Sequence, residues 1–95
     1  MALTIQVTPS FARIAKKLHL KDKEALDAAV KAVASYHTIG EEKRGDLNGV
    51  FVHKFKLNNR ETLLAYRLQP DKLAAQELVL LAVGPHENFY VQLKR

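Results

Sequence analysis

The sequence contains no cysteine and no tryptophan, and it has only one methionine, three prolines and four glycines. Without cysteine, the chain has neither a disulfide framework nor a thiolate for catalysis or metal binding. No apolar run reaches the roughly 20 residues that a membrane helix needs. Residues 1–7 are too short and too polar for a signal peptide. We therefore expect a soluble, cytoplasmic protein with no membrane partner.

Acidic residues are also in deficit. The 95 residues include 10 Asp and Glu against 15 Lys and Arg, which gives a formal net charge of +5. That excess favours a polyanionic partner, such as nucleic acid, an acidic protein or anionic lipid. A basic protein with no such partner can have the same composition, so the positions of the charges must decide. The length suits one hydrophobic core, and we expect a single domain over residues 1–95.

The first forty residues carry a strand pattern followed by two helical patterns. Residues 3–7 alternate apolar and polar side chains, which is typical of a half-buried strand. Thr8 and Pro9 then provide an N-cap and a first-turn proline. An apolar stripe follows at helical spacing, made of Phe11, Ile14, Ala15 and Leu18. Asp22 can cap a second helix that ends near Gly40, a candidate left-handed cap. The two helices are expected to form an antiparallel hairpin.

Residues 41–49 are expected to form a charged loop, after which the apolar period changes to two. In residues 50–57 one side of a strand carries Phe51, His53, Phe55 and Leu57, and the other carries Val50, Val52, Lys54 and Lys56. An Asn-Asn pair predicts a hairpin turn, and strands over residues 61–68 and 76–83 follow. The sequence therefore predicts an α+β fold in the order β-α-α-β-β-β, with an antiparallel sheet, the helical hairpin on one face, the other face partly open and a short C-terminal helix.

Two lysines stand out on the strand over residues 50–57. Because its aromatic side must lie under the helices, Lys54 and Lys56 are expected on the open face, about 7 Å apart, a spacing suited to neighbouring phosphates. Arg67 falls on the corresponding side of the next strand and can join them. Exposed strands also carry lysine simply to prevent edge pairing, so a solvated face is the alternative.

The last ten residues hold a second candidate pair. If they form a helix, His86 and Tyr90 lie one turn apart on the same face, beside Lys94 and Arg95. Both side chains can move protons. A histidine at a helix start is also a common local cap, and aromatic residues there can simply dock the tail, so the spacing leaves both interpretations open. No set of His, Asp and Glu has metal-ligand spacing and no glycine-rich phosphate loop is present, so we expect neither a metal nor a cofactor.

From Lys43 onward the sequence resembles the RelE/ParE superfamily of small bacterial toxins from type II toxin–antitoxin pairs. The resemblance rests on the element order and on four stretches, residues 43–50 (KRGDLNGV), 53–57 (HKFKL), 64–67 (LAYR) and 81–90 (LAVGPHENFY). It implies a RelE-like microbial ribonuclease fold and an endoribonuclease, or mRNA interferase, that cuts mRNA on the translating ribosome and is silenced by a cognate antitoxin. It also implies an alternative, a ParE-like toxin that poisons DNA gyrase without ribonuclease activity.

The chemistry implied by the resemblance needs no metal. A base takes the proton of a ribose 2′-hydroxyl, the 2′-oxygen attacks the adjacent phosphate, cations stabilise the phosphorane, and an acid protonates the leaving 5′-oxygen. The implied catalytic residues are His86, Tyr90, Lys54 and Lys56. The expected RNA-binding residues are Lys43, Arg44, Arg60, Arg67, Lys94 and Arg95. Several members carry an arginine where this sequence has Leu63, and Arg67 and Arg60 are the candidates to supply that charge.

Overall fold

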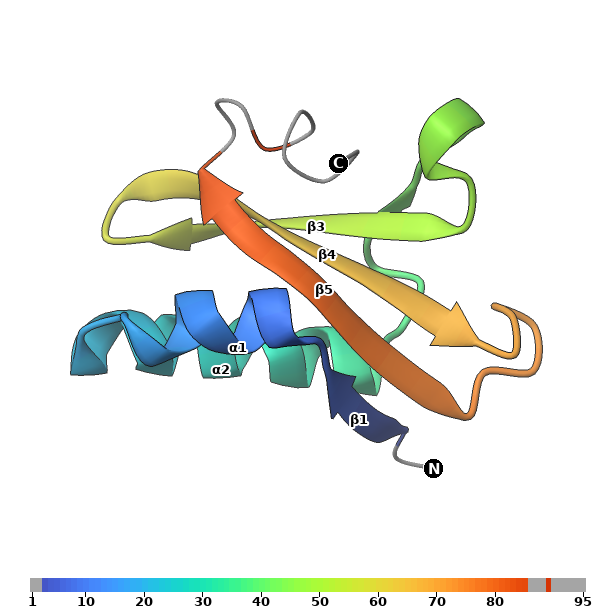
Figure 1. Cartoon of the computed structure of the whole chain (residues 1–95), viewed down its shortest axis with the longest axis horizontal. Helices are drawn as coiled ribbons and strands as arrows, with labels where there is room; N and C mark the ends of the chain where they lie inside the picture. Colours follow the sequence, from blue (N-terminus) through green and yellow to red (C-terminus); the bar gives the residue numbers. More distant parts are fainter. Residues whose placement is uncertain (1–2, 86–88, 90–95) are drawn as a thin grey trace.

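The structure, a computed structural model, describes residues 3–85 and residue 89. Within these residues a five-stranded sheet carries two helices on one face, which confirms the expected α+β class (Figure 1). The elements in chain order are β1 (Thr4–Val7), α1 (Pro9–Lys16), α2 (Leu20–Ser35), β2 (Glu41–Glu42), the 3₁₀-helix η1 (Gly45–Leu47), β3 (Val50–Leu57), β4 (Arg60–Gln69) and β5 (Glu77–Pro85). The short β2 and η1 are additions to the expected order, and both lie in the segment predicted to be a loop.

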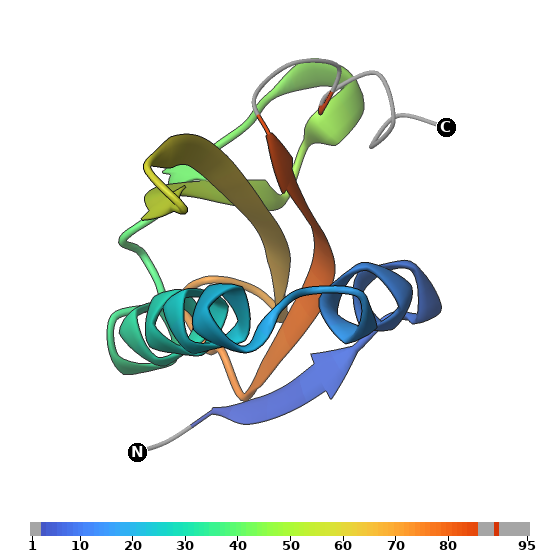
Figure 2. The ribbon, with the colours of Figure 1, turned by 90° about the vertical axis from the view of Figure 1, so that its left-hand side faces the viewer.

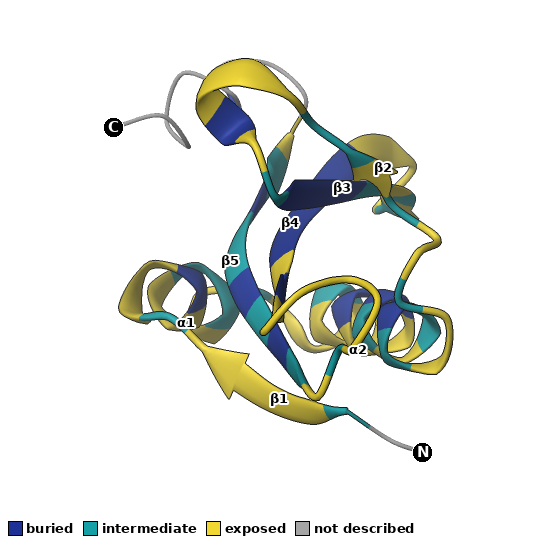
Figure 3. Cartoon of the chain, turned by 90° about the vertical axis from the view of Figure 1, so that its right-hand side faces the viewer, coloured by how far each residue is buried: buried dark blue, intermediate teal, exposed yellow. Residues whose placement is uncertain are grey.

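The sheet is mixed rather than wholly antiparallel. Its strand order is β1-β5-β4-β3-β2, and β1 runs parallel to β5 while the other neighbours are antiparallel. All four residues of β1 are exposed, although their alternation predicted a half-buried strand (Figure 3). The reason is its position, because β1 is an edge strand and α1 packs mainly on β5.

The start of α1 is as predicted. The Thr8 hydroxyl oxygen accepts a hydrogen bond from the backbone N–H of Phe11 at 3.3 Å, and Pro9 opens the helix. The same hydroxyl lies 3.0 Å from the carbonyl oxygen of Leu80, to which it can donate. An N-cap of this kind contributes about 1 kcal/mol. Thr8 therefore both begins α1 and joins it to β5.

The boundaries of α2 differ from the prediction. The helix begins at Leu20 with His19 as its N-cap, so Asp22 lies in the first turn instead, where the helix dipole still favours a carboxylate. The helix ends at Ser35. Gly40 lies beyond that end, and its φ is not positive, so it is not a left-handed cap. Figure 2 shows α1 (blue) and α2 (teal) seen along their axes, with β3 and β4 above them and β1 below.

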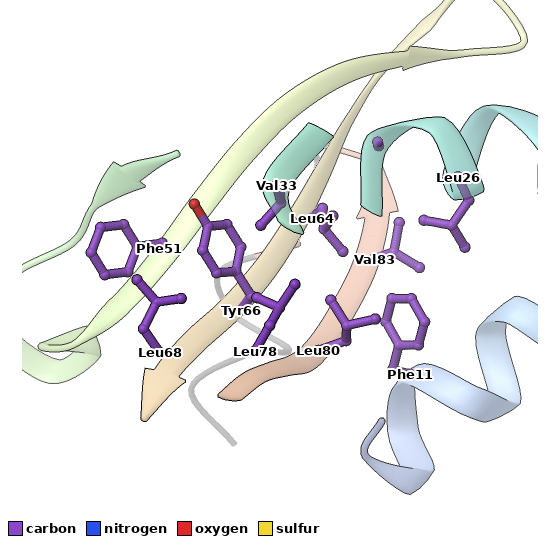
Figure 4. Close-up of a cluster of buried hydrophobic side chains, with 11 residues drawn as sticks. Phe11, Leu26, Val33, Phe51, Leu64, Tyr66, Leu68, Leu78, Leu80 and Val83 are labelled. Carbon is purple, nitrogen blue, oxygen red and sulfur yellow. The ribbon is translucent and has the colours of Figure 1, made fainter. Parts of the chain in front are cut away.

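The face of the sheet under the helices, here called the helix-covered face, holds the larger core (Figure 4). It contains Phe11, Leu26, Ala29, Val33, Phe51, Leu64, Tyr66, Leu68, Leu78, Leu80 and Val83. Tyr66 is fully buried at its centre, and its ring stacks on that of Phe51 with centroids 5.4 Å apart. Its hydroxyl donates to the carbonyl oxygen of His37 at 2.8 Å and accepts the N–H of Gly40 at 3.0 Å. The predicted inward side of β3 is confirmed, because Phe51 belongs to this core and Phe55 packs against it.

The opposite face, here called the second face, carries Val50, Val52, Lys54 and Lys56 of β3. It is not open along its whole length, because Leu47 of η1 and Phe89 join Val50, Val52, Leu63 and Ala65 in a smaller core. In Figure 1 the turn with η1 lies on the side of the sheet away from the helices. Beyond this core, toward the β3–β4 turn, the second face is exposed, and both lysines lie there. The predicted C-terminal helix lies outside the described residues.

Candidate nucleic-acid interface

The β3–β4 turn sets the geometry of the second face. Asn58 and Asn59 have φ values of +53° and +64°, as the predicted two-residue hairpin requires at both central positions. Asparagine tolerates this left-handed region better than most residues. A two-residue turn also fixes the strand register. Lys56 consequently lies directly opposite Glu61 on β4, and Lys54 lies opposite Leu63.

Lys54 and Lys56 are the exposed cations of the second face near this turn. They alternate with Phe55, which packs against the core of the helix-covered face, so their side chains project away from the helices. Alternate residues of a strand lie about 7 Å apart. Neither ammonium group forms an ion pair within 4 Å among the described residues. Both charges are therefore available to an anion such as a phosphate diester.

Lys43 behaves differently from this pair. Its ammonium group forms an ion pair with Glu41 at 2.5 Å, and Glu41 lies opposite Val52, next to the lysine strand. The hydrogen bond and the positive charge of Lys43 lower the pKa of the Glu41 carboxyl, and Lys54 contributes more weakly. Arg44 is exposed and immediately precedes η1. At the β2 edge of the second face, the ion pair of Lys43 with Glu41 is therefore followed by the exposed Arg44.

The two arginines expected beside the lysines lie elsewhere. Arg67 is on the second face but opposite Val50, four residues along β3 from Lys54, or about 13 Å. Arg60 alternates onto the helix-covered side, where it borders a cavity of about 510 Å³ lined also by Leu18, Asp22 and Leu57. The structure therefore brings neither side chain to the lysine pair.

Leu63 itself has no exposed surface and belongs to the smaller core, so no charge occupies its position.

Of the C-terminal segment only Phe89 is described. His86, Tyr90, Lys94 and Arg95 lie outside the described residues. Phe89 is buried in the smaller core of the second face, and its Cδ1 would lie 3.6 Å from a Cβ added to Gly84. Gly84 pairs with Leu63, which in turn pairs with Lys54. One residue of the tail is thus anchored on the same face as the lysines, three positions after His86 and one before Tyr90 in the sequence.

Glu61 is a charged residue beside the lysine pair that the sequence analysis did not single out. It is exposed on the second face, directly opposite Lys56, and it forms no ion pair within 4 Å among the described residues. The signal was present, because counting back by two from Leu63 along the predicted strand reaches Glu61. Within residues 3–85 and 89, no group of three His, Asp or Glu side chains could hold a metal ion, and no helix is long and apolar enough to cross a membrane.

Comparison with known structures finds the same fold in RelE toxins. The free E. coli toxin RelE, as a double arginine-to-alanine mutant, is 19% identical with a TM-score of 0.72, and the match covers 99% of this chain and 94% of that one. The toxin–antitoxin complex RelBE from E. coli is 19% identical with a TM-score of 0.69, covering 90% and 99%. A RelBE complex from Mycobacterium tuberculosis is 21% identical with a TM-score of 0.67, covering 90% and 100%.

Comparison with curated protein sequences gives no significant match. A family profile, that of the ParE-like toxins of type II bacterial toxin–antitoxin systems, matches residues 5–94. The match spans both helices, all five strands and the C-terminal segment, so it extends the resemblance beyond the part that begins at Lys43. The chain therefore belongs to the ParE-like toxins of type II bacterial toxin–antitoxin systems.

Proposed function

We propose that this toxin is a ribosome-dependent mRNA endonuclease that inhibits translation and growth and is held silent by a cognate antitoxin. The observation that carries the proposal is the exposed pair Lys54 and Lys56, which forms no ion pair within residues 3–85 and 89, on the face that also anchors Phe89. Two lysines whose backbone positions lie about 7 Å apart on one side of a strand suit adjacent phosphates of one RNA strand. The net charge of +5 favours such a partner. Its site of action is the cytoplasm, where messages are translated.

The proposed chemistry is attack of a ribose 2′-hydroxyl on the neighbouring phosphate. Lys54 and Lys56 bind the phosphate and stabilise the charge that develops on its oxygens. His86 acts as the base or the acid, and Tyr90 stacks on a base or assists a proton transfer. Lys94 and Arg95 contact the RNA backbone, with Arg44 and Arg67 as more distant contacts. The RelBE complexes among the similar structures support a dedicated antitoxin partner.

Primer extension on a message under translation tests this function. The wild-type protein is expected to cut the message, and to leave intact a message with 2′-deoxyribose at the cleavage position. We expect His86→Ala to lower the cleavage rate by about 10² or more, the usual contribution of one acid or base. If His86→Ala cuts as fast as wild type, His86 has no catalytic role. If the wild-type protein does not cut the message, the proposed function is wrong.

The lysine pair is tested with a charge-matched control. Lys54→Gln with Lys56→Gln removes two charges from the second face, and Lys17→Gln with Lys31→Gln removes two exposed charges near the helices. The first variant should lose about 10²-fold or more in cleavage, because it loses transition-state stabilisation. The second should cut like wild type. Equal losses in both variants would mean that net charge, rather than the site, binds the RNA.

Poisoning of DNA gyrase is the second candidate, and two observations favour it. Leu63, where several members of the superfamily carry an arginine, is apolar and fully buried. The ParE-like description of the family points in the same direction. This candidate predicts induction of a DNA-damage response while messages stay intact, and gyrase-dependent DNA cleavage in a purified system.

A further inference from the structure

The cavity that Arg60 borders lies at one end of the helix-covered face, on the opposite side of the sheet from the lysine pair. The β3–β4 hairpin and the end of β5 line one side of it, and the end of α1 and the start of α2 line the other. Figures 1 and 2 show the β3–β4 turn and the α1–α2 connection at the same end of the molecule. A volume of about 510 Å³ is within the range of cavities that hold small molecules.

Much of the cavity wall is apolar. Ile14 and Leu18 line it from the helical side, and Leu57 and Val83 line it from the sheet. Val83 belongs to the larger core, and Ile14 and Leu18 pack against that core. Apolar side chains on two opposite walls can contact both faces of a flat ring system. The cavity therefore suits a ligand whose body is an aromatic ring or a fused pair of rings.

Two side chains of opposite charge line the same cavity. Asp22 comes from the first turn of α2, and Arg60 is the first residue of β4. They form no ion pair with each other, so their charged groups lie more than 4 Å apart. A carboxylate only accepts hydrogen bonds, whereas a guanidinium group only donates them. A ligand that spans the cavity therefore needs hydrogen-bond donors at its helical end and an acceptor, preferably an anion, at its sheet end.

A guanine nucleotide has this arrangement of groups. The Watson–Crick edge of guanine presents two adjacent donors, N1–H and the N2 amino group, which one carboxylate can accept together. Adenine and cytosine each place a ring acceptor beside their amino group, and uracil has one donor between two acceptors. The phosphate is an anion that a guanidinium group binds well, often through two parallel hydrogen bonds. The net charge of +5 further favours an anionic ligand.

We propose that this cavity is a binding site for a guanine nucleotide, separate from the lysine pair and independent of the proposed cleavage. Asp22 accepts the two donors of the base, Arg60 binds the phosphate, and the apolar side chains contact the faces of the rings. The nucleotide is either free, as in GMP, or part of an RNA strand, since both carry the same base and phosphate. Binding is non-covalent in either case.

Calorimetric binding of nucleotides to the purified full-length toxin tests the contact with the base. Wild type should bind GMP at least tenfold more tightly than IMP, which lacks the N2 amino group. Asp22→Asn should bind GMP and IMP with similar affinity, because an amide oxygen beside an amide N–H group cannot accept both donors. Glu24→Gln changes an exposed carboxylate of α2 that does not line the cavity, and it should keep the wild-type preference. Absence of GMP binding, or a preference for GMP that persists in Asp22→Asn, would overturn the proposal.

The contact with the phosphate is tested by comparing GMP with guanosine. Wild type should bind GMP at least tenfold more tightly, and Arg60→Gln should bind both ligands alike. Lys31→Gln, which removes an exposed charge of α2 outside the cavity, should behave like wild type. Equal affinities for GMP and guanosine in wild type, or equal losses of GMP affinity in both variants, would overturn the assignment of Arg60.

A hexaribonucleotide with one internal guanosine identifies the source of the nucleotide. If it displaces GMP from wild type, the cavity binds a guanosine of an RNA strand, and if it does not, the cavity binds the free nucleotide. All of these measurements record binding and none requires cleavage. Failure of the proposed ribonuclease activity and failure of the guanine site are therefore distinguished.

Discussion

The two faces of the sheet are formed by the same strands, but they differ in how much of their surface is buried and in where their charges lie. The helix-covered face is closed by Phe11, Leu26 and Val33 from two helices, and its central tyrosine has both hydroxyl hydrogen bonds satisfied. The second face has a small core under η1 and Phe89, and beyond it the strands carry exposed charges that form no ion pair with other described residues. The larger core therefore lies on the helix-covered face, and the exposed lysines lie on the second.

The contrast also explains how a chain of 95 residues keeps a charged surface without a penalty to its fold. Charged side chains are costly when buried and nearly neutral when they remain in water. Lys54, Lys56 and Glu61 are exposed, while their strand neighbours Phe55 and Thr62 face the other way and are at least partly buried. Strand alternation alone thus separates the two environments.

The largest expected effect compares two adjacent leucines with no exposed surface, Leu64 on the helix-covered face and Leu63 on the second face. We expect Leu64→Ala to lower the free energy of unfolding by about 4 kcal/mol and Leu63→Ala by about 2–3 kcal/mol. The loop and the single aromatic residue above Leu63 can relax into a cavity more readily than packed helices can. Urea denaturation measures both values, and equal losses would contradict the comparison.

A smaller effect is expected where the helix-covered face meets the backbone of Gly40. A Cβ at this position would lie 2.6 Å from the Tyr66 hydroxyl oxygen and 3.0 Å from Cε1 of the ring. Gly40→Ala should therefore cost about 1–3 kcal/mol by overpacking. Tyr66→Phe should cost a similar amount, because the N–H of Gly40 and the carbonyl of His37 lose their partner.

The double variant Gly40→Ala with Tyr66→Phe decides whether that contact is the cause. Removing the hydroxyl removes the atom nearest to the new methyl group. The loss in free energy of unfolding of the double variant should therefore be smaller than the sum of the two single losses, by about 0.5 kcal/mol or more. Strictly additive losses in denaturation experiments would show that the cost of Gly40→Ala arises elsewhere.

Most of the fold could be predicted from the sequence because local patterns determine it. The alternation of β3 and β4, the Asn58-Asn59 turn and the Thr8 cap each depend on neighbouring residues, and each is confirmed. The exposure of β1 and the role of Gly40 depend instead on distant strands. Gly40 contacts Tyr66, which lies 26 positions away in the sequence. From the sequence alone, a glycine required by this close contact cannot be distinguished from one required by a left-handed backbone angle.

The candidate site could be predicted only in part, for a similar reason. Lys54 and Lys56 follow from alternation within one strand. The separation of Arg67 from them, the position of Arg60 on the other face and the pairing of Glu61 with Lys56 all follow from register across the hairpin. Once the two-residue turn is accepted, this register is fixed, and Glu61 could have been assigned from sequence. The roles of His86 and Tyr90 stay predictions.

The smallest effect concerns the margin of the helix-covered face, where His53 is partly buried and stacks on Phe55 with ring centroids 6.3 Å apart. Burial lowers the pKa of His53 below its usual 6.5. The unfolded chain then binds more protons than the folded one between the two pKa values, so stability rises with pH in that window. The contribution of neutral His53 to stability is fully present above about pH 6.5, and it declines as the pH falls toward the pKa of His53 in the folded state. We expect His53→Phe to flatten this part of the stability curve.

Urea denaturation at several pH values between about 5 and 7.5 measures the slope in both proteins, above the range in which carboxylates titrate. The lowered pKa of Glu41 acts only below 4.5, so it does not disturb the comparison. As a control on the second face, Lys54→Gln should leave the slope unchanged. If stability depends on pH with the same slope in His53→Phe as in wild type, burial does not shift the pKa of His53. The margin of the helix-covered face is then as solvated as the exposed part of the second face, and the two faces differ only in their buried cores.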